Sequence, residues 1–238
     1  MTSNTASPLA RPFPAIPEIG GVTRRIARAR YKTWDRCDLT FMTFDEGTSV
    51  AGVLTQSKCP SSEVDWCREH LPQGKARALV VSAGNANAFT GRRGREAVEA
   101  VTARVAKHLQ CPVETVFVSA TGVIGVPLPI HKAEAGLDAA ILSPPCSWEA
   151  AAATIMTTDT FPKGAVATAI IGEKTVTLAG IIKGSGMIAP DMATMLGYIV
   201  TDAAVEPGFL QRMISAANQE TFSCITVESD TSTSPSLL

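Results

Sequence analysis

The chain has 238 residues, of which 45% are hydrophobic and 18% are charged. This balance fits one large or two small globular domains with a sizeable core, and it excludes a disordered tail protein. The formal net charge of −1 gives no strong field toward nucleic acid or an anionic membrane, so we expect any charged substrate to be recognised by local groups.

The six cysteines are scattered, with no CxxC pair and no cysteine/histidine cluster at zinc spacing, so free thiols and no metal site are expected. The apolar runs are much shorter than the roughly 20 residues that span a bilayer, which predicts a soluble protein with no membrane partner. The histidines, His70, His108 and His131, form no credible serine or cysteine triad, and we expect all three at the surface.

Residues 1–20 are rich in proline, serine and alanine, which predicts an extended N-terminal arm. Several arginines follow Arg11, up to Arg30, against the single acid Glu18. This pattern faintly resembles an organelle transit peptide, but a solvated arm is the favoured interpretation, and a cytoplasmic protein is expected.

Two strands, 38–44 and 49–54, are predicted to form a hairpin around a turn at 45–47. A buried strand at 78–81 and the loop AGNANAFTG come next. The helix predicted at 94–109 carries valines and a leucine at helical spacing. A strand at 115–119 then leads into ATGVIG, which completes a strand, loop, helix, strand unit.

Ser147 is placed to cap a helix that runs into TTDTFPKG. Strands at 165–171 and 174–182 are joined through Gly172 and Glu173 and lead into KGSGMIAPDMAT. A strand through Val200, a helix from Pro207 and a last strand at 222–227 complete the prediction.

The segment KGSGMIAPDMAT places the hydroxyl of Thr194 directly after Ala193. A threonine that follows a small residue on a flexible backbone can cut its own chain, and the new α-amino group can then serve as its general base. The unperturbed pKa of such an amine is about 8, so no histidine is needed. A glycine-rich loop with a threonine is, however, more often only a turn.

Other groups complete the predicted site. Thr121 and Gly122, directly after a strand, are a candidate oxyanion hole, with a helix cap or a turn as the alternative. Lys183 could bind a substrate carboxylate or perturb the amine, or could be a solvated strand end. Thr157, Thr158, Asp159, Thr160 and Lys163 form a polar patch that suits a small polar ligand, although capping and turn formation explain these residues equally well.

Five separated motifs, VVSAGNANAFTG, SATGVIG, TTDTFPKG, KGSGMIAPDMATML and ITVESDTST, together resemble the ornithine acetyltransferase (glutamate N-acetyltransferase) family. The resemblance runs in order from about residue 20 to residue 233. It implies an α+β fold, a layered α/β/β/α sandwich of the self-processing ornithine acetyltransferase and aminopeptidase type. It also divides the chain into an arm at 1–20, an α-chain region at 21–193 and the start of a β-chain region at 194–238.

The resemblance further implies cleavage between Ala193 and Thr194 and acetyl transfer from N-acetylornithine to glutamate through an acetyl-threonine, in arginine biosynthesis. By resemblance, Thr194 is the nucleophile, Thr121 and Gly122 form the oxyanion hole, and Thr158, Lys183 and Thr194 contact substrate. No cofactor is implied, although acetyl-CoA serves some members as acetyl donor. The α and β chains are expected to associate as a heterotetramer of two of each.

Three departures from the family pattern stand out: Asp191 replaces the usual asparagine, Ser82 and Ala83 alter the usual VNSGNANA, and the β-chain region reaches only Leu238. The sequence therefore predicts a family member with its C-terminal part, and the substrate-binding residues located there, missing. Two alternatives stay open: an inactive fragment or pseudo-enzyme that acts only by binding, and a related self-processing aminopeptidase. A nucleotide-binding loop is disfavoured because AGNANAFTG has neither GxGxxG nor GK[ST] spacing.

Overall fold

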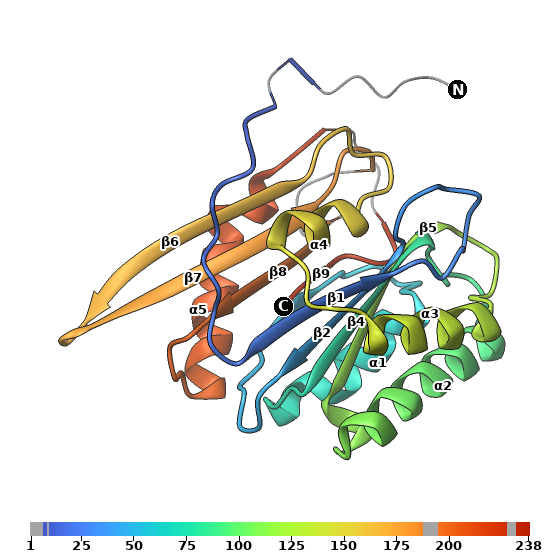
Figure 1. The fold of residues 1–238 in the computed structure, drawn as a ribbon, viewed down its shortest axis with the longest axis horizontal. Coiled ribbons are helices and arrows are strands. Elements are labelled where there is room, and N and C mark those ends of the chain that lie inside the picture. The colour runs from blue at the N-terminus through green and yellow to red at the C-terminus, as the bar shows by residue number, and fades with distance from the viewer. Residues whose placement is uncertain (1–6, 9, 188–194, 228–231) are drawn as a thin grey trace.

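Two β-sheets form the centre of the computed structural model, which describes residues 7–8, 10–187, 195–227 and 232–238 (Figure 1). The first sheet has the order β1-β2-β4-β5 and the second has the order β3-β9-β8-β7-β6. The strands are β1 Val22–Ala27, β2 Leu39–Phe44, β3 Val53–Leu54, β4 Ala78–Asn85, β5 Val116–Val123, β6 Lys163–Ile171, β7 Lys174–Lys183, β8 Leu196–Thr201 and β9 Ser236–Leu237.

The first sheet holds the most buried strand. Every residue of β4 is buried, as expected for a strand covered on both faces, and its first four residues, ALVV, are all apolar. β4 runs parallel to β5, and the helix α2 (Gly91–Leu109) makes the crossover between them. The carboxyl ends of both strands therefore meet at one edge of the sheet.

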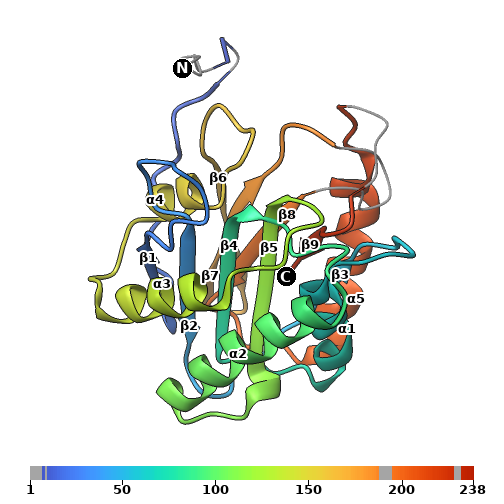
Figure 2. The ribbon, with the colours of Figure 1, turned by 90° about the vertical axis from the view of Figure 1, so that its right-hand side faces the viewer.

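Three helices, α1 (Ser62–His70), α2 and α3 (Ile130–Leu142), cover one face of the first sheet (Figure 2). Val98, Val101 and Val105 of α2 are buried, as their spacing predicted. On the other side, α4 (Trp148–Thr154) contacts β1, β6 and β7, and α5 (Pro207–Glu220) lies beside the second sheet. Short 3₁₀ turns complete the elements at Leu71–Gln73, Val113–Thr115 and Phe222–Cys224.

β6 and β7 form a long antiparallel hairpin that extends beyond the helices (Figure 1). Gly172 at its tip has φ +63, a conformation that favours glycine. At the other end of the hairpin, Lys183 closes β7 and pairs with Leu196, the first residue of β8. The predicted cleavage segment is the connection between these two paired residues.

The arginine-rich N-terminal part is not a solvated arm. Residues 10–19 are extended, as predicted, but Ile19 is buried. Arg24 is also buried: its guanidinium pairs with Glu18 at 2.7 Å and stacks 4.0 Å above the Trp148 ring. The basic residues that suggested a transit peptide therefore include one that ties the N-terminal segment to α4.

The predictions of local structure succeed where periodicity or capping is strong. The α+β class and the α/β/β/α layering are confirmed, as are the helices begun by the cap Ser147 and by Pro207. The Ser147 hydroxyl accepts the Ala150 N–H at 3.1 Å. Within the described residues, no helix is both long and apolar enough to cross a membrane.

One predicted hairpin and one predicted strand are wrong. Residues 39–44 pair with β1 and β4 in the first sheet, whereas 53–54 pair with β9 in the second, so they form no hairpin. Residues 222–224 form a 3₁₀ turn instead of beginning a strand. For the hairpin, strand partners distant in sequence decided the outcome. Strand β1 and helices α1 and α3 were not predicted, since their apolar residues are few or irregularly spaced.

Candidate active site

Thr121 and Gly122 lie at the carboxyl end of β5, against the end of β4. Gly122 has φ +132, and a Cβ atom there would lie 2.3 Å from the carbonyl carbon of Gly84 and 2.6 Å from the amide nitrogen of Asn85. Both atoms belong to the paired backbone, so only glycine fits. Thr121 is buried and Gly122 is exposed. The predicted oxyanion pair therefore lies at a solvent-accessible sheet edge, with its backbone fixed by close contact.

The loop that follows β4 is tied to the loop that follows β5 by amide side chains. Asn85 accepts the Asn87 N–H at 2.8 Å and donates to the Val126 carbonyl at 3.0 Å. Asn87, at φ +49, accepts the Leu128 N–H at 3.1 Å. The two asparagines of AGNANAFTG thus serve as structural ties beside Gly122.

The buried carboxyl group of Glu63 forms a hydrogen bond with the loop that follows β4. Asn87 donates from its amide nitrogen to Glu63 Oε1 at 3.0 Å, and Glu63 Oε2 has no hydrogen-bond partner among the described residues. Burial raises the pKa of Glu63 to about 8, and the hydrogen bond from Asn87 offsets this only in part. Glu63 is therefore mainly protonated at neutral pH, and it adds little charge to this half of the site.

The second half of the site surrounds Lys183. Its side chain is buried at the end of β7, and its Nζ donates to Thr157 Oγ1 at 3.3 Å. Burial lowers the pKa of Lys183 to about 8, although the nearby carboxylate of Asp159 acts in the opposite direction. The alternative reading of Lys183 as a solvated strand end is therefore wrong.

Asp159 is fully buried beside Lys183. One carboxylate oxygen accepts from Lys163 Nζ at 2.5 Å and from the Gly184 N–H at 2.8 Å, and the other accepts the Thr157 N–H at 3.3 Å. Burial by itself would raise the Asp159 pKa, but the hydrogen bonds from Lys163 and Gly184 and the two lysine charges outweigh it and lower the pKa. Asp159 therefore carries a negative charge at neutral pH.

The segment 29–38 joins the two halves. Its Asp38 carboxylate accepts the N–H groups of Ala29 and Tyr31 at 2.6 and 2.8 Å, which holds the segment in a tight turn. Trp34 packs over Gly84 on one side, and on the other side Arg36, stacked on the Trp34 ring, donates to carbonyls at the end of α4. Arg36 also donates to the Met156 carbonyl, so one folded segment contacts both the end of β4 beside the predicted oxyanion pair and the loop that leads to Asp159.

The structure places only some of the predicted site residues in contact with one another. The described structure pairs Lys183 with Thr157, whereas Thr158 is exposed and makes no such contact with Lys183. Ala193 and Thr194 lie outside the described residues. The segment 29–38 and Glu63 were missed; the clustered aromatic and arginine residues of RYKTWDR were a signal for the first, and no sequence signal marked Glu63.

The expectation of surface histidines is correct for His108 and His131 but wrong for His70. Both ring nitrogens of His70 are buried without a hydrogen-bond partner among the described residues, and its ring packs edge-on against Trp66 at 4.4 Å between centroids. All six cysteines are free, as predicted. His70 is therefore a packing residue at the end of α1.

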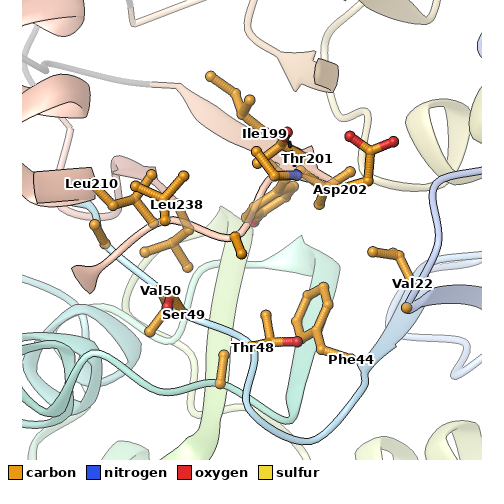
Figure 3. Close-up of a pocket in the computed structure, with 18 of the residues that line it drawn as sticks. Val22, Phe44, Thr48, Ser49, Val50, Ile199, Thr201, Asp202, Leu210 and Leu238 are labelled. Carbon is orange, nitrogen blue, oxygen red and sulfur yellow. Dashed lines mark hydrogen bonds between the residues drawn. The ribbon is translucent and has the colours of Figure 1, made fainter. Parts of the chain in front are cut away.

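A cavity of about 710 Å³ opens between the two sheets, apart from the predicted site residues of the described chain (Figure 3). Val22 and Phe44 line it from the first sheet, and Leu210 and Leu238 line it from the opposite side. The apolar face of α5, which includes Met213 and Ile214, also borders it. Most of the lining is apolar, as in an unfilled core, although Thr48, Thr201 and Asp202 also border the hollow.

The two-layered sheets with outer helices define a class of folds seen in solved structures. The structure matches the arginine biosynthesis bifunctional protein ArgJ of Bacillus halodurans with a TM-score of 0.66 and 31% identity, over 74% of this chain and 92% of that chain. For the ornithine acetyltransferase of Mycobacterium tuberculosis, solved with ornithine, the TM-score is 0.62 at 28% identity, over 73% and 93% of the two chains. The PH0078 protein of Pyrococcus horikoshii, at 13% identity and a TM-score of 0.52, shares the fold alone.

Sequence comparison narrows the class to one family. The arginine biosynthesis bifunctional protein ArgJ of Zymomonas mobilis is 60% identical over 233 residues, which are 98% of this chain and 57% of that protein. The ArgJ of Mesorhizobium japonicum is 51% identical over 239 residues, 99% of this chain and 58% of that protein. The ArgJ family model matches residues 23–238, and the chain belongs to the ArgJ family. It spans somewhat more than half the length of these curated relatives.

Proposed function

We propose that this chain carries the self-cleavage and acetyl-transfer centre of an N-acetyltransferase of arginine biosynthesis. In this proposal Thr194 attacks the bond that follows Ala193, and the freed threonine then takes the acetyl group from N-acetylornithine and passes it to glutamate. The observation that carries the proposal is the family match across 23–238, which includes the whole predicted site. A cytoplasmic location fits this biosynthetic role.

The geometry supports the assigned roles. The bond between Ala193 and Thr194 falls in the connection between β7 and β8, whose described ends, Lys183 and Leu196, are register partners. We assign Thr121 and Gly122 to the oxyanion hole because Gly122 leaves no room for a side chain at an exposed sheet edge. We assign Lys183 to a substrate carboxylate, and Thr158, exposed on the adjacent loop, to a second substrate contact.

The lengths of the relatives support chain cleavage. The 233 matched residues are 57% of the Zymomonas mobilis protein, which is therefore about 410 residues long. The match to the Bacillus halodurans structure covers 74% of 238 residues, about 176, and these are 92% of that chain, which is therefore about 190 residues long. A solved chain of that length agrees with an α chain that ends near Ala193. An assembly of two α and two β chains remains part of the proposal.

The acetyl group would reach glutamate in two steps. The α-amino group of Thr194 takes the proton of the Thr194 hydroxyl as Oγ attacks the acetyl carbonyl carbon. The C–N bond to ornithine then breaks, and the departing amine takes that proton from the α-ammonium group. The glutamate amine then attacks the acetyl-threonine ester and regenerates the hydroxyl. No cofactor is required, and acetyl-CoA is a second acetyl donor to be tested. This scheme predicts ping-pong kinetics, with ornithine leaving before glutamate binds.

The test is the intact mass of the purified protein beside its Thr194→Ala variant. We expect the wild-type chain to separate into fragments that end at Ala193 and begin at Thr194, and the variant to stay whole. A folded wild-type chain that remains whole would refute self-cleavage. Cleavage of both proteins would point to a contaminating protease.

The cavity favours a second candidate, in which the chain acts only by binding a complementary polypeptide. The apolar hollow beside α5 and the additional length of the relatives point to the same occupant, the part of an ArgJ protein outside the matched region. Co-expression with that part of the Zymomonas mobilis protein tests this. A stable complex without acetyl transfer from N-acetylornithine supports the binding role, and a complex with transfer supports the enzyme.

A further inference from the structure

The polar cluster at the end of β7 contains more charge than a single substrate contact requires. Lys183 is buried, and its ammonium group has one hydrogen-bond partner among the described residues, Thr157. Asp159 accepts the N–H of Thr157 on one side and the N–H of Gly184 on the other. The carboxylate therefore fixes both the residue that receives the Lys183 hydrogen bond and the residue that follows Lys183 in the chain.

The charges around Lys183 oppose one another. Asp159 attracts the Lys183 ammonium group, while Lys163, paired with Asp159 at 2.5 Å, repels it. Arg36, in the segment 29–38, adds a further positive charge near Asp159. It also interacts electrostatically with Asp38. The Asp159 carboxylate thus interacts with three cations, Lys163, Lys183 and Arg36. The electrostatic stabilisation of the Lys183 ammonium group depends on the attraction by Asp159 and on the repulsion by the other two cations.

We propose that Asp159 is a positioning residue, which holds Lys183 in place and, together with Lys163, sets the fraction of Lys183 that is charged near neutral pH. The effect on the charge of Lys183 does not depend on the proposed function. Only its consequence, the recognition of an amino-acid carboxylate, rests on that function. A charged Lys183 attracts the carboxylate of the substrate, and a neutral one does not. Asp159 and Lys163 therefore determine the pH range over which Lys183 binds the substrate carboxylate.

The chain offers substitutions that move the charge of Lys183 in opposite directions. Asp159→Asn removes the negative charge and keeps an oxygen that accepts the Gly184 N–H. Lys163→Met removes the competing cation and leaves Asp159 in place. Lys174→Met is the matched control, because Lys174 is exposed at the far tip of the β6–β7 hairpin.

The experiment is an NMR titration of the Lys183 Cε signal in protein labelled with ¹³C-lysine, assigned with Lys183→Met. Burial lowers the pKa of Lys183 to about 8, so its titration falls in an accessible range. We expect Asp159→Asn to move the Lys183 midpoint down by about 1 pH unit, Lys163→Met to move it up, and Lys174→Met to leave it unchanged.

Shifts in the same direction, or no shift in either variant, would overturn the inference. If Asp159→Asn does not fold, the Lys163→Met midpoint decides: an upward shift supports the inference, and an unchanged midpoint contradicts it. The titration reads the charge of Lys183 without any turnover. Its failure is therefore distinct from a failure of the proposed function, which the Thr194→Ala comparison reads.

Discussion

The two halves of the candidate site consist of different kinds of chemical group. The edge of the first sheet is made of backbone and amide groups, with Gly122 pressed against Gly84 and Asn87 tied to a mainly protonated Glu63. The end of β7 is made of charges, with Lys183 and Asp159 both buried. The first half should respond to added atoms and the second to added or removed charge, so each half fails for a different reason.

Gly122→Ala should have the largest effect, and it probes the backbone half. The new methyl group would overlap the backbone at Gly84 and would occupy a φ that L-residues rarely adopt, so we expect a loss of stability of more than about 4 kcal/mol, or no folding. Urea denaturation measures this. Gly125→Ala is the control: its φ of +84 is also positive, but the position has open space, and the change should cost about 1 kcal/mol. Equal losses would show that sterics do not define this half.

Glu63→Gln tests whether the backbone half is neutral at working pH. The Glu63 pKa is raised in the folded state, to about 8 from an ordinary value of 4.5, so its folding contribution is fully present below about pH 4.5 and is lost as the pH rises through 8. We expect the variant and the wild type to match near pH 4.5, and the variant to become more stable by a few kcal/mol at pH 9. Denaturation curves at several pH values measure the difference. A constant difference would mean that Glu63 is already ionised.

Thr157→Val should have the smallest effect, and it probes the contact that distinguishes Thr157 from Thr158. Removal of the hydroxyl leaves the Lys183 Nζ without the hydrogen bond seen at 3.3 Å, so we expect a loss of stability of about 1 kcal/mol. Thr158→Val, at an exposed position, should stay within about 0.5 kcal/mol of the wild type. Thermal unfolding of both variants checks this. A larger loss for Thr158→Val than for Thr157→Val would show that Thr158, and not Thr157, contacts Lys183.

The local structure near the site could be predicted because its signals are short-range. Ser147 caps its helix by a hydrogen bond three residues ahead, and β6 and β7 meet through a two-residue turn. The link from Asn87 to Glu63, 24 residues away, has no comparable signal, because it depends on how α1 packs under the loop. The same reason explains the wrong hairpin, since β2 and β3 belong to different sheets.

The sequence by itself determined the family, the α+β class and the bond proposed for cleavage, because motif order and the residues around Ala193 and Thr194 are properties of the chain. Only the tertiary structure decided which threonine contacts Lys183, that Arg24 is buried, and that the site consists of a neutral half and a charged half. Burial is the physical reason. The pKa of a carboxyl or an ammonium group depends on the solvent and charges that the fold leaves around it, and residues distant in sequence supply them.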